Sequence, residues 1–565
     1  MKVFFSYTTK LAAAFCLVVL VSTACEQAGG DPLSPPKPGG TPEQVLLYRE
    51  PGLSRYDPPV TLSFVRENSD SLEKLLSELP GETLADNRWT RLYEEVLGIR
   101  IQYEWIARGN LFHRKFGVSL ASGEIPDVVR VNASQLRMLS SEGLIQDLTE
   151  VYEAYATPLT KQVLSEEGSG PFDTATIGGR LMAIPETGSS IEGAMFIWIR
   201  TDWLEQLGLQ PPKTMDDVLT ISKAFTEKDP DRDGLQNTYG LALTKYLWDP
   251  VMGLSGFMAG YDAYPNLWIQ DERGQLVYGG IQPEVKAALA ALQDMYRTGQ
   301  LDKEFAIKDG EKAGRLIAEE KVGMLYGEQW GSFLVQTSRK QNPDAKWKAF
   351  PIVSLSGEPP KVPLPFATQQ FLAVRQGYPH PEALVKLFNL HLEKNWGVTG
   401  EYETYYNSPL AVWKLSPVNP FPVMKNLDAY LQLEEFRRTG DASVLKDEAK
   451  TIQKRIAAYE AGGSEEATGW GWNLTYGPSG AMSILKQYKA NNQLLHEAFT
   501  GVPTETMIEK QTILYNMRND VFLDIIQGRP LSEFDQFVDQ WKELGGERIT
   551  QEVNAWYREK GGVKP

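Results

Sequence analysis

Strand-like runs alternate with helix-like stretches along the first part of this chain. The runs VTLSFV (60–65), IRIQYEW (99–105) and PDVVRV (126–131) read as strands, and polar or amphipathic stretches separate them. This alternation is typical of α/β proteins, in which helices connect parallel strands. The sequence therefore predicts an α/β fold with parallel sheets.

Capping residues mark the ends of several helices in the middle of the chain. Thr214 is a good N-cap, and Asp217, three residues later, completes a capping-box pattern. Pro283 and Pro381 suit the first position of a helix, and Gly299 is a typical helix stop. The last third of the chain is also expected to be helical.

The size and charge of the chain narrow its possible partners. With 565 residues, the chain is long enough for two or more domains. Its 57 basic and 73 acidic side chains give a net charge of −16. A protein this acidic is poorly suited to a polyphosphate backbone, so we expect no nucleic-acid partner.

The N-terminus reads as an export signal followed by a lipidation site. Lys2 and Lys10 precede an apolar run over 11–21, which fits a signal peptide and is short for a membrane span. Ser22-Thr23-Ala24-Cys25 resembles the lipobox of bacterial lipoproteins, with Ser22 where that pattern prefers Leu. We expect a signal peptide over 1–24 and acyl chains on Cys25; the alternative is a single N-terminal membrane helix.

A flexible tether is expected after the lipidation site. Residues 25–59 are rich in proline and in paired glycines, a composition that cannot bury enough apolar surface to fold alone. Cys16 and Cys25 are the only cysteines in the sequence. If Cys16 leaves with the signal peptide and Cys25 carries lipid, the mature domains contain no disulfide and no cysteine metal site.

Several segments together resemble one known family. The chain resembles the large extracellular solute-binding lipoproteins of bacterial ABC importers, of the carbohydrate type that includes alginate- and maltose-binding proteins. The segments that carry the resemblance are LASGEIPDVVRV (120–131), GLIQDLTEVYEAY (143–155), GGRLMAIPET (178–187), WIRTDWLEQLGLQPPKTMDDVLTISKAF (198–225), KDPDRDGLQNTYGLAL (228–243), LDKEF (301–305), KVGMLYGEQW (321–330) and ERITQEVNAWY (547–557).

The resemblance implies a two-lobe, periplasmic-binding-protein-like (type II) fold with the solute held between the lobes. We expect lobe 1 to comprise 60–185 and about 366–425. Lobe 2 would comprise 186–365 and much of 426–565, including a helical C-terminal region. The chain would cross between the lobes near 183–186 and again near 363–370.

The resemblance also implies partners and a location. We expect a lipid-anchored monomer on the extracellular face of the cell membrane. It would bind an oligosaccharide or a related small solute and pass it to the transmembrane subunits of an ABC permease. The lipid on Cys25 would be its contact with the membrane.

Aromatic side chains are the first candidates for a sugar site, because they can stack on the apolar faces of sugar rings. Trp330 follows the turn Tyr326-Gly327-Glu328-Gln329, and the resemblance implies a stacking role for it. Trp470 and Trp472 lie in ATGWGWNLTYG, which we expect to be a loop. The other aromatic candidates are Trp248, Tyr402, Tyr405 and the adjacent Tyr406.

Carboxylates and one arginine complete the candidate set. Asp127, Glu186 and Glu328 could accept hydrogen bonds from sugar hydroxyls, and Arg200 could donate them. Each may equally be structural, as may any single tryptophan. Trp198 and Trp203 are expected in the core because they lie on a scaffold strand and helix.

The segment DPDRDGLQN has the spacing of a calcium loop. Asp229, Asp231, Asp233, the carbonyl of Leu235 and Asn237 resemble the first nine positions of an EF-hand loop. Similar loops in this transporter family hold a structural calcium ion, so we expect Ca²⁺ here; the alternative is a solvated Asp-rich turn. The loop departs from the pattern at position twelve, where Gly240 replaces a bidentate Glu.

Motifs for metal-dependent, serine and nucleotide-dependent catalysis are missing from the sequence. None of His113, His380, His391 and His496 belongs to an HExxH motif, and the sequence contains no GxSxG elbow and no P-loop. We therefore expect a binding protein and no catalytic residues. The alternatives are a secreted glycoside-active enzyme with a carboxylate pair, which no motif can exclude, and a purely structural envelope protein.

Overall fold

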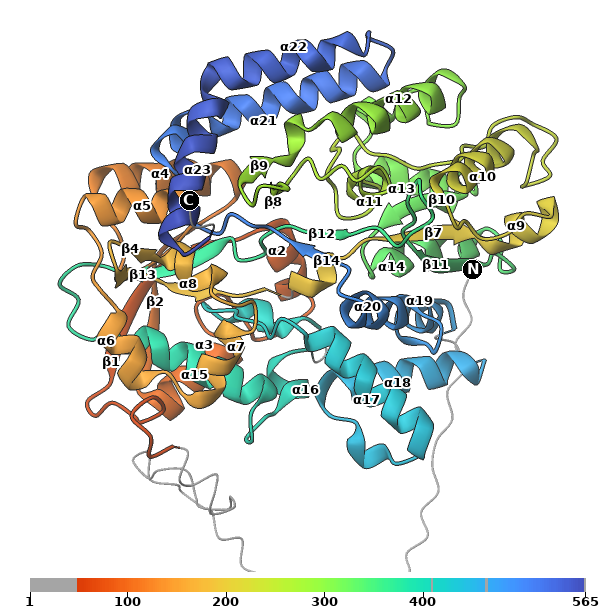
Figure 1. The fold of residues 1–565 in the computed structure, drawn as a ribbon. Coiled ribbons are helices and arrows are strands. Elements are labelled where there is room, and N and C mark those ends of the chain that lie inside the picture. Colours follow the sequence, from red (N-terminus) through yellow and green to blue (C-terminus); the bar gives the residue numbers. More distant parts are fainter. Residues whose placement is uncertain (1–47, 189, 408–409, 463–465, 563–565) are drawn as a thin grey trace, which may run out of the picture. The chain divides into compact units, whose positions relative to one another are not determined.

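The computed structural model describes residues 48–188, 190–407, 410–462 and 466–562 (Figure 1). The expected signal peptide, Cys25 and the first part of the tether lie outside the described residues. Among the helices that are described, none has the length and apolar character needed to cross a membrane.

A three-stranded sheet organises the first lobe. Strand β13 (Gln370–Val374) lies between β3 (Val128–Val131) and β6 (Ile184–Glu186) and is antiparallel to both. Next to it, β1 (Val60–Glu67) and β2 (Ile99–Ala107) form a parallel pair. The predicted strands are present, but parallel pairing is confirmed only in part, because β13 comes from a distant stretch of the chain and runs the opposite way.

Short helices surround these strands, and one long helix is almost wholly buried. In α15 (Glu382–Trp396), every residue from Ala383 to Asn395 is buried, so this helix forms the centre of its lobe. The other elements are α2 (Asp70–Ser77), α3 (Arg88–Leu92), α4 (Gly109–Ser122), α5 (Ala133–Ser141), α6 (Thr149–Tyr155), α7 (Pro158–Ser165), α8 (Gly170–Ala175), β4 (Thr176–Ile177), β5 (Arg180–Leu181) and α16 (Tyr402–Tyr405).

Residues 48–59, expected at the end of the tether, belong to the folded body instead. Leu53 is buried, and Lys386 Nζ donates to the carbonyl of Ser54 at 2.8 Å. Asn389 Nδ2 donates to the carbonyl of Gly52, also at 2.8 Å. Proline content predicted a tether here, but side chains of α15 satisfy these backbone groups and hold the segment in place.

A second sheet organises the other lobe. Strand β7 (Phe196–Arg200) lies between β10 (Met324–Gly327) and β11 (Trp347–Pro351) and is antiparallel to both. A small hairpin forms from β8 (Trp268–Gln270) and β9 (Leu276–Tyr278). The helices are α9 (Thr201–Leu207), α10 (Met215–Glu227), α11 (Ser255–Ala259), α12 (Pro283–Arg297), α13 (Gly310–Ala318), α14 (Gly331–Val335), α17 (Lys425–Thr439), α18 (Asp447–Glu460), α19 (Glu466–Tyr476), α20 (Ala481–Ala490), α21 (Glu505–Ile526), α22 (Ser532–Trp541) and α23 (Glu547–Glu559).

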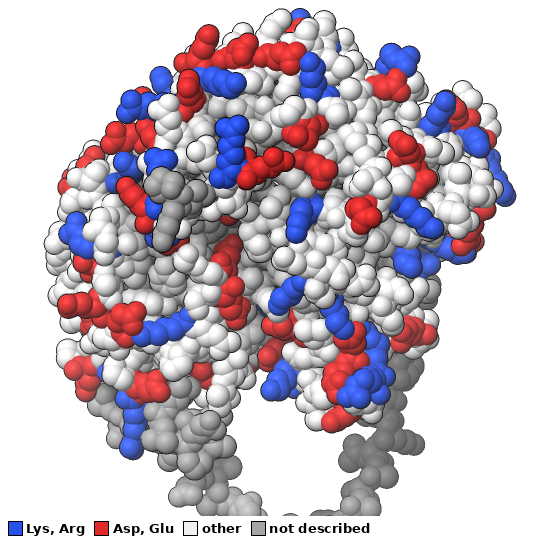
Figure 2. All heavy atoms as spheres, viewed as in Figure 1, with Lys and Arg blue, Asp and Glu red and all other residues white. Residues whose placement is uncertain are grey.

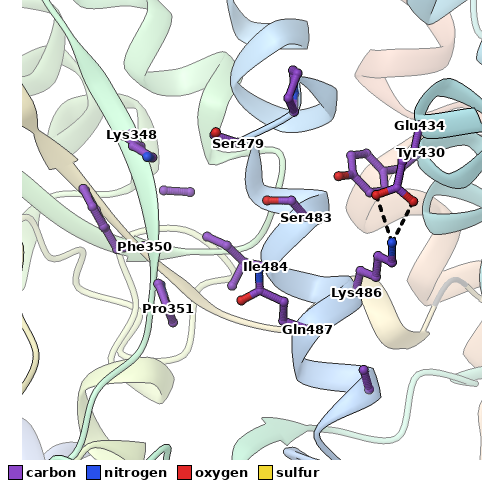
Figure 3. Close-up of a pocket in the computed structure, with 13 residues that line it drawn as sticks. Lys348, Phe350, Pro351, Tyr430, Glu434, Ser479, Ser483, Ile484, Lys486 and Gln487 are labelled. Atoms are coloured by element: carbon purple, nitrogen blue, oxygen red, sulfur yellow. Dashed lines mark hydrogen bonds and ion pairs between the residues drawn. The ribbon is translucent and has the colours of Figure 1, made fainter. Parts of the chain in front are cut away.

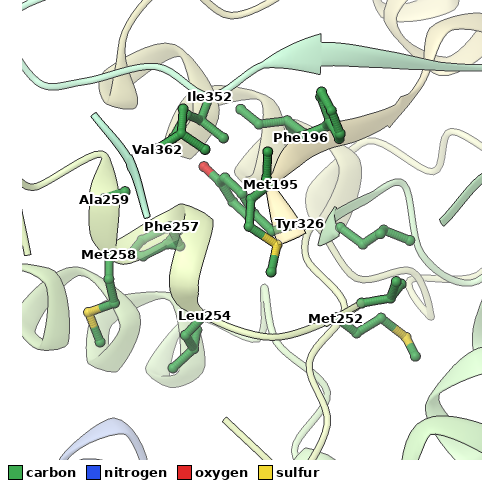
Figure 4. Close-up of a cluster of buried hydrophobic side chains, with 14 of the residues drawn as sticks. Met195, Phe196, Met252, Leu254, Phe257, Met258, Ala259, Tyr326, Ile352 and Val362 are labelled. Atoms are coloured by element: carbon green, nitrogen blue, oxygen red, sulfur yellow. The ribbon is translucent and has the colours of Figure 1, made fainter. Parts of the chain in front are cut away.

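The core of the second lobe packs the sheet against α11 (Figure 4). Phe196 and Tyr326 are buried side chains of β7 and β10, and Phe257 of α11 meets the Tyr326 ring edge-on with centroids 6.0 Å apart. Gly256 permits this approach, because a Cβ there would lie 2.4 Å from the Tyr326 ring. Each large apolar side chain buried in this way contributes about 1.5–3 kcal/mol.

The chain passes between the two sheets more than once. It leaves β6 and enters β7 through 187–195, and it returns from β11 to β13 through 352–369. Within the return, β12 (Val362–Leu364) pairs in parallel with β14 (Leu494–His496). The exact division of the chain between the lobes stays a prediction.

The C-terminal helices pack onto the second lobe and also reach the first. In α21, the buried Arg518 donates from Nη1 to the Tyr278 hydroxyl at 2.6 Å, and the Tyr278 ring stacks on Trp541. In α23, the Asn554 side chain accepts a hydrogen bond from the Leu276 N–H and donates one to the Leu276 carbonyl. Lys560, just past α23, forms an ion pair with Asp173 of α8 at 2.5 Å.

Candidate functional site

Just past the end of β10, the exposed aromatic ring of Trp330 lies beside the partly buried carboxyl group of Glu328. Trp330 is 39% exposed, and its Nε1 donates to Glu328 Oε2 at 2.8 Å. The Glu328 backbone is fixed on both sides: its N–H donates to the carbonyl of Pro250 at 2.9 Å, and its carbonyl accepts from Trp198 Nε1 at 3.2 Å. Burial raises the pKa of Glu328 to about 7. This pair offers a stacking face and a hydrogen-bonding edge on one rigid turn.

The turn lies beside the first crossing between the lobes. Glu328 Oε1 is 3.9 Å from the position that a Cβ at Gly193 would occupy. The neighbouring Glu192 accepts hydrogen bonds from the Asn426 backbone and side chain, and burial raises its pKa to about 7. Carboxyl groups are thus gathered where segments of both lobes meet.

A buried ion pair and two tyrosines adjoin Glu192. Lys425 Nζ lies 2.7 Å from Glu448 Oε2 and 5.2 Å from the centroid of the Tyr406 ring. Tyr406 stacks on Tyr402, with centroids 4.5 Å apart. Tyr402 is 5% exposed, and its hydroxyl has no hydrogen-bond partner among the described residues. An unpaired buried hydroxyl is costly, which makes this position receptive to a polar ligand group.

The other aromatic candidates lie elsewhere and pack against the protein. Tyr405 packs against the buried Trp89, with centroids 5.1 Å apart. Trp248 donates from Nε1 to Asn519 Oδ1 at 2.8 Å and borders a surface cavity of about 400 Å³ between its loop and α21. The expectation that these two rings belong to one sugar site with Trp330 stays a prediction.

Trp470 and Trp472 lie on helix α19, so the expectation of a loop is wrong. Gly469 and Gly471 allow α19 to approach its neighbours closely. A Cβ at Gly469 would lie 2.7 Å from the carbonyl of Arg455 in α18, and one at Gly471 would lie 3.0 Å from the Phe333 ring. Trp470 is buried under the guanidinium of Arg339, and Trp472 meets the Phe333 ring edge-on.

A surface cavity of this lobe contains none of the predicted site residues. It has a volume of about 520 Å³ and lies between β11, α17 and α20 (Figure 3). Lys348 and Phe350 line one side, and Tyr430, Glu434 and Lys486 line the other. The Lys486–Glu434 ion pair, 2.7 Å long, closes part of its rim.

The remaining charged candidates have structural partners. Asp127 accepts from the Ser63 N–H at 3.0 Å and from Arg375 at 2.7 Å, which fixes its loop to β1 and β13. The buried Arg200 forms ion pairs with Asp202 and Glu320. Both residues thus have structural partners, and a contact of Asp127 with a solute stays a prediction. Trp198 and Trp203 are buried, as predicted.

Glu186 belongs to a polar cluster that the sequence did not reveal. Its carboxylate is 2.9 Å from Arg130 Nη2, and Arg130 also donates to the carbonyl of Pro417. Arg66 donates to the carbonyl of Ser416 at 3.0 Å, and burial lowers its pKa. Arg66 and Arg130 lie at the ends of β1 and β3. Their place at strand ends is the one signal that could have indicated them.

Charged side chains of both signs are scattered over the face of the molecule shown in Figure 2. On the face shown in Figure 2, acidic and basic groups are interspersed, and acidic groups also lie in the hollow near the middle of that face. The charges on that face thus form no continuous basic surface.

The predicted calcium loop brings its acidic side chains together. Oxygens of Asp229, Asp231 and Asp233 lie within 4.8 Å of one another, a spacing at which they could hold a metal ion. The Nζ of Lys321 is also present, at 2.8 Å from Asp231 Oδ2 and 2.7 Å from Asp233 Oδ2.

Comparison with known proteins identifies the family. Residues 71–393, more than half of the chain, match the model of the bacterial extracellular solute-binding protein family. This chain is a bacterial extracellular solute-binding protein. Among solved structures, an HMO-binding, ABC-transporter-associated solute-binding protein from Bifidobacterium longum infantis has a TM-score of 0.59 at 14% identity. The match covers 88% of this chain and 98% of that one, and it shows the two-lobe type II α/β fold.

Two curated relatives of this solute-binding protein come from Bacillus subtilis strain 168. Lipoprotein LipO is 26% identical over 274 residues, which are 47% of this chain and 51% of LipO. The polygalacturonan/rhamnogalacturonan-binding protein YtcQ is 28% identical over 218 residues, which are 38% of this chain and 41% of YtcQ. The match thus spans about half the length, or less, of these two curated relatives.

Proposed function

We propose that this protein captures an oligosaccharide between its lobes at the cell surface and delivers it unchanged to an ABC permease. The observation that carries the proposal is the Trp330–Glu328 pair at the first crossing. An exposed indole and an adjacent carboxyl match the apolar face and hydroxyl edge of a sugar ring.

The relatives support a carbohydrate. YtcQ is described as binding polygalacturonan or rhamnogalacturonan, and the solved neighbour from Bifidobacterium as HMO-binding. The latter is also described as associated with an ABC transporter. We infer the same class of ligand and the same kind of membrane partner for this chain.

Two lobes joined by crossing segments suit a receptor that closes on its ligand. A ligand shifts an open–closed equilibrium only by its difference in affinity for the two states. A solute that touches Trp330 on one side and the cluster around Arg130 and Glu186 on the other would favour the closed state. The closed state would then present a distinct surface to the permease, and no bond of the solute needs to break.

A thermal-shift screen tests the proposal. We expect an oligosaccharide from plant or microbial polysaccharides to raise Tm, because ligands that bind the native state stabilise it. Neutral and uronate-containing glycans form separate arms of the screen. A bound glycan recovered with new reducing ends would instead indicate the glycoside-active enzyme, and no shift with any glycan would refute the sugar proposal.

The lipid anchor is part of the same proposal. We infer that Cys25 carries the acyl chains that hold the receptor at the membrane, since two chains suffice for stable anchoring. LipO supports this by its description as a lipoprotein. Metabolic labelling with a radioactive fatty acid should mark the wild type and leave the Cys25→Ser variant unlabelled; equal labelling of both would refute it.

A further inference from the structure

The ammonium group of Lys321, a cation of the protein itself, lies among the oxygens of the loop over 229–237. Lys321 Nζ donates to Asp231 Oδ2 at 2.8 Å, to Asp233 Oδ2 at 2.7 Å and to Asn237 Oδ1 at 2.9 Å. These three oxygens belong to positions three, five and nine of the EF-hand-like pattern. An ammonium group with three donors therefore stands among the oxygens that a calcium ion would use.

The oxygen donors that remain are too few for a typical calcium site. Calcium takes six to eight oxygens, and the EF-hand obtains two of them from a bidentate Glu at position twelve. Here position twelve is Gly240, where a Cβ would lie 2.0 Å from Ser222 Oγ, so no side chain fits. Thr238 turns its hydroxyl away to the carbonyl of Phe225 at 2.7 Å and is buried.

The hydrogen bonds inside the loop also fit an ammonium group. Asn237 donates from Nδ2 to Asp233 Oδ2 at 2.9 Å, which leaves its Oδ1 for Lys321. The side chain of Asp231 is only 6% exposed, so its charge needs a partner close by. Lys321 is itself held by its backbone, because its N–H donates to the carbonyl of Leu316 at 2.7 Å.

We propose that the Lys321 ammonium takes the place of the calcium ion in this loop, so that the native fold of the loop does not require calcium. Lys321 also joins the loop to the start of β10, the strand that is followed by Glu328 and Trp330. The Tyr239 N–H donates to the Lys321 carbonyl at 2.8 Å, next to the start of that strand. Lys321, a residue of the folded scaffold, thus takes the place of a calcium ion bound from solution.

Melting curves in 1 mM EDTA and in 1 mM CaCl₂ test this proposal on the wild type and on Lys321→Met. The wild-type Tm is expected to be the same in both media. In EDTA the variant should melt roughly 3–6 °C lower than the wild type, because the carboxylates of Asp231 and Asp233 lose their cationic partner. Calcium should restore most of that loss, since the vacated oxygens can then bind the ion.

Lys223→Met is the matched control, because Lys223 is an exposed lysine of the adjacent helix α10 with only a 4.0 Å contact to Glu227. Its Tm should equal that of the wild type in both media. Three results would overturn the proposal: a wild type stabilised by calcium, a Lys321→Met protein as stable as the wild type in EDTA, or a destabilised variant that calcium does not rescue.

If Lys321→Met fails to fold, calcium titration of the wild type by calorimetry decides the question. Absence of binding heat at millimolar calcium supports the lysine as the resident cation. Micromolar binding would show that the ion displaces Lys321, and the proposal would be wrong.

Discussion

Trp330 Nε1 donates a hydrogen bond to Glu328 Oε2 at 2.8 Å, so the partly buried carboxyl group holds the exposed indole ring in one orientation. The backbone of Glu328 is itself hydrogen-bonded to Pro250 and Trp198. The indole of Trp330 is therefore oriented before any ligand binds. Pre-orientation lowers the entropic cost of binding.

Replacing Trp330 should weaken ligand binding without unfolding the protein. Trp330→Ala removes the stacking face and is expected to raise the Kd for the bound glycan by roughly 10–100-fold. Trp330→Phe keeps a ring and should lose less. Titration calorimetry measures both, with Tyr246→Ala, an exposed aromatic outside the proposed contact, as the control. An unchanged Kd in Trp330→Ala would remove Trp330 from the site.

Glu328 should make the protein less stable as the pH rises. Its folded-state pKa is about 7 against an ordinary value of 4.5, so the native state binds the proton more tightly. The contribution of Glu328 is therefore fully present below pH 4.5 and is lost as the pH rises through 7. Glu328→Gln should be more stable than the wild type at pH 8, by roughly 2 kcal/mol after allowance for partial exposure, and similar to it at pH 4.5.

Urea unfolding at the two pH values measures this difference. Glu284→Gln, an exposed position at the start of α12, serves as the control and should show no such dependence on pH. If Glu328→Gln has the same stability relative to the wild type at both pH values, the raised pKa is wrong.

His391 should have the opposite dependence on pH. It is fully buried and stacked on Trp89 with centroids 4.7 Å apart, and burial lowers its pKa to about 3 from an ordinary 6.5. The unfolded state therefore binds more protons below pH 6.5, and stability falls as the pH drops toward 3.

Comparison with His391→Phe isolates the contribution of His391 to the pH dependence of stability, because phenylalanine keeps a ring but cannot take up the proton. Between pH 7 and pH 5 the wild type should lose roughly 2 kcal/mol more than the variant. His113→Phe, at an exposed position of α4, is the control and should follow the wild type. Parallel pH profiles for wild type and His391→Phe would contradict the prediction.

The two glycines Gly469 and Gly117 should respond to alanine in opposite ways. A Cβ at Gly469 would lie 2.5 Å from Tyr459 Cβ and 2.7 Å from a backbone oxygen, so Gly469→Ala should destabilise the protein by about 1–3 kcal/mol. Gly117, inside helix α4, has open space around it, and Gly117→Ala should stabilise the protein by about 0.5–1 kcal/mol. Thermal or urea unfolding checks both, and equal effects would show that α18 and α19 are not in close contact.

Local signals predicted much of the scaffold. The capping box of Thr214 and Asp217 is confirmed, as is Pro283 at the start of α12. Strands β1, β2 and β3 lie where strand-like runs predicted them. Such signals work because a cap or an alternating run acts within a few residues of itself.

At the candidate site, local sequence signals failed to predict the structure, because contacts between residues distant in the sequence determine it. Gly469 and Gly471 read as loop residues because the helices packed against them, α18 and α14, are invisible in the local pattern. Lys321 is 84 residues from Asn237, so its place among the loop oxygens could not be read from spacing. The structural partner of Asp127, Arg375, is even more distant.

The ion pair between Lys560 and Asp173 links the region just past α23 to α8 of the first lobe. Since α23 is bonded to β9 through Asn554, any swing that carries α8 away from that hairpin must pull this pair apart. Neutralising either residue would therefore alter the equilibrium between wide and narrow separations of the lobes, and with it the apparent affinity for the ligand that we propose.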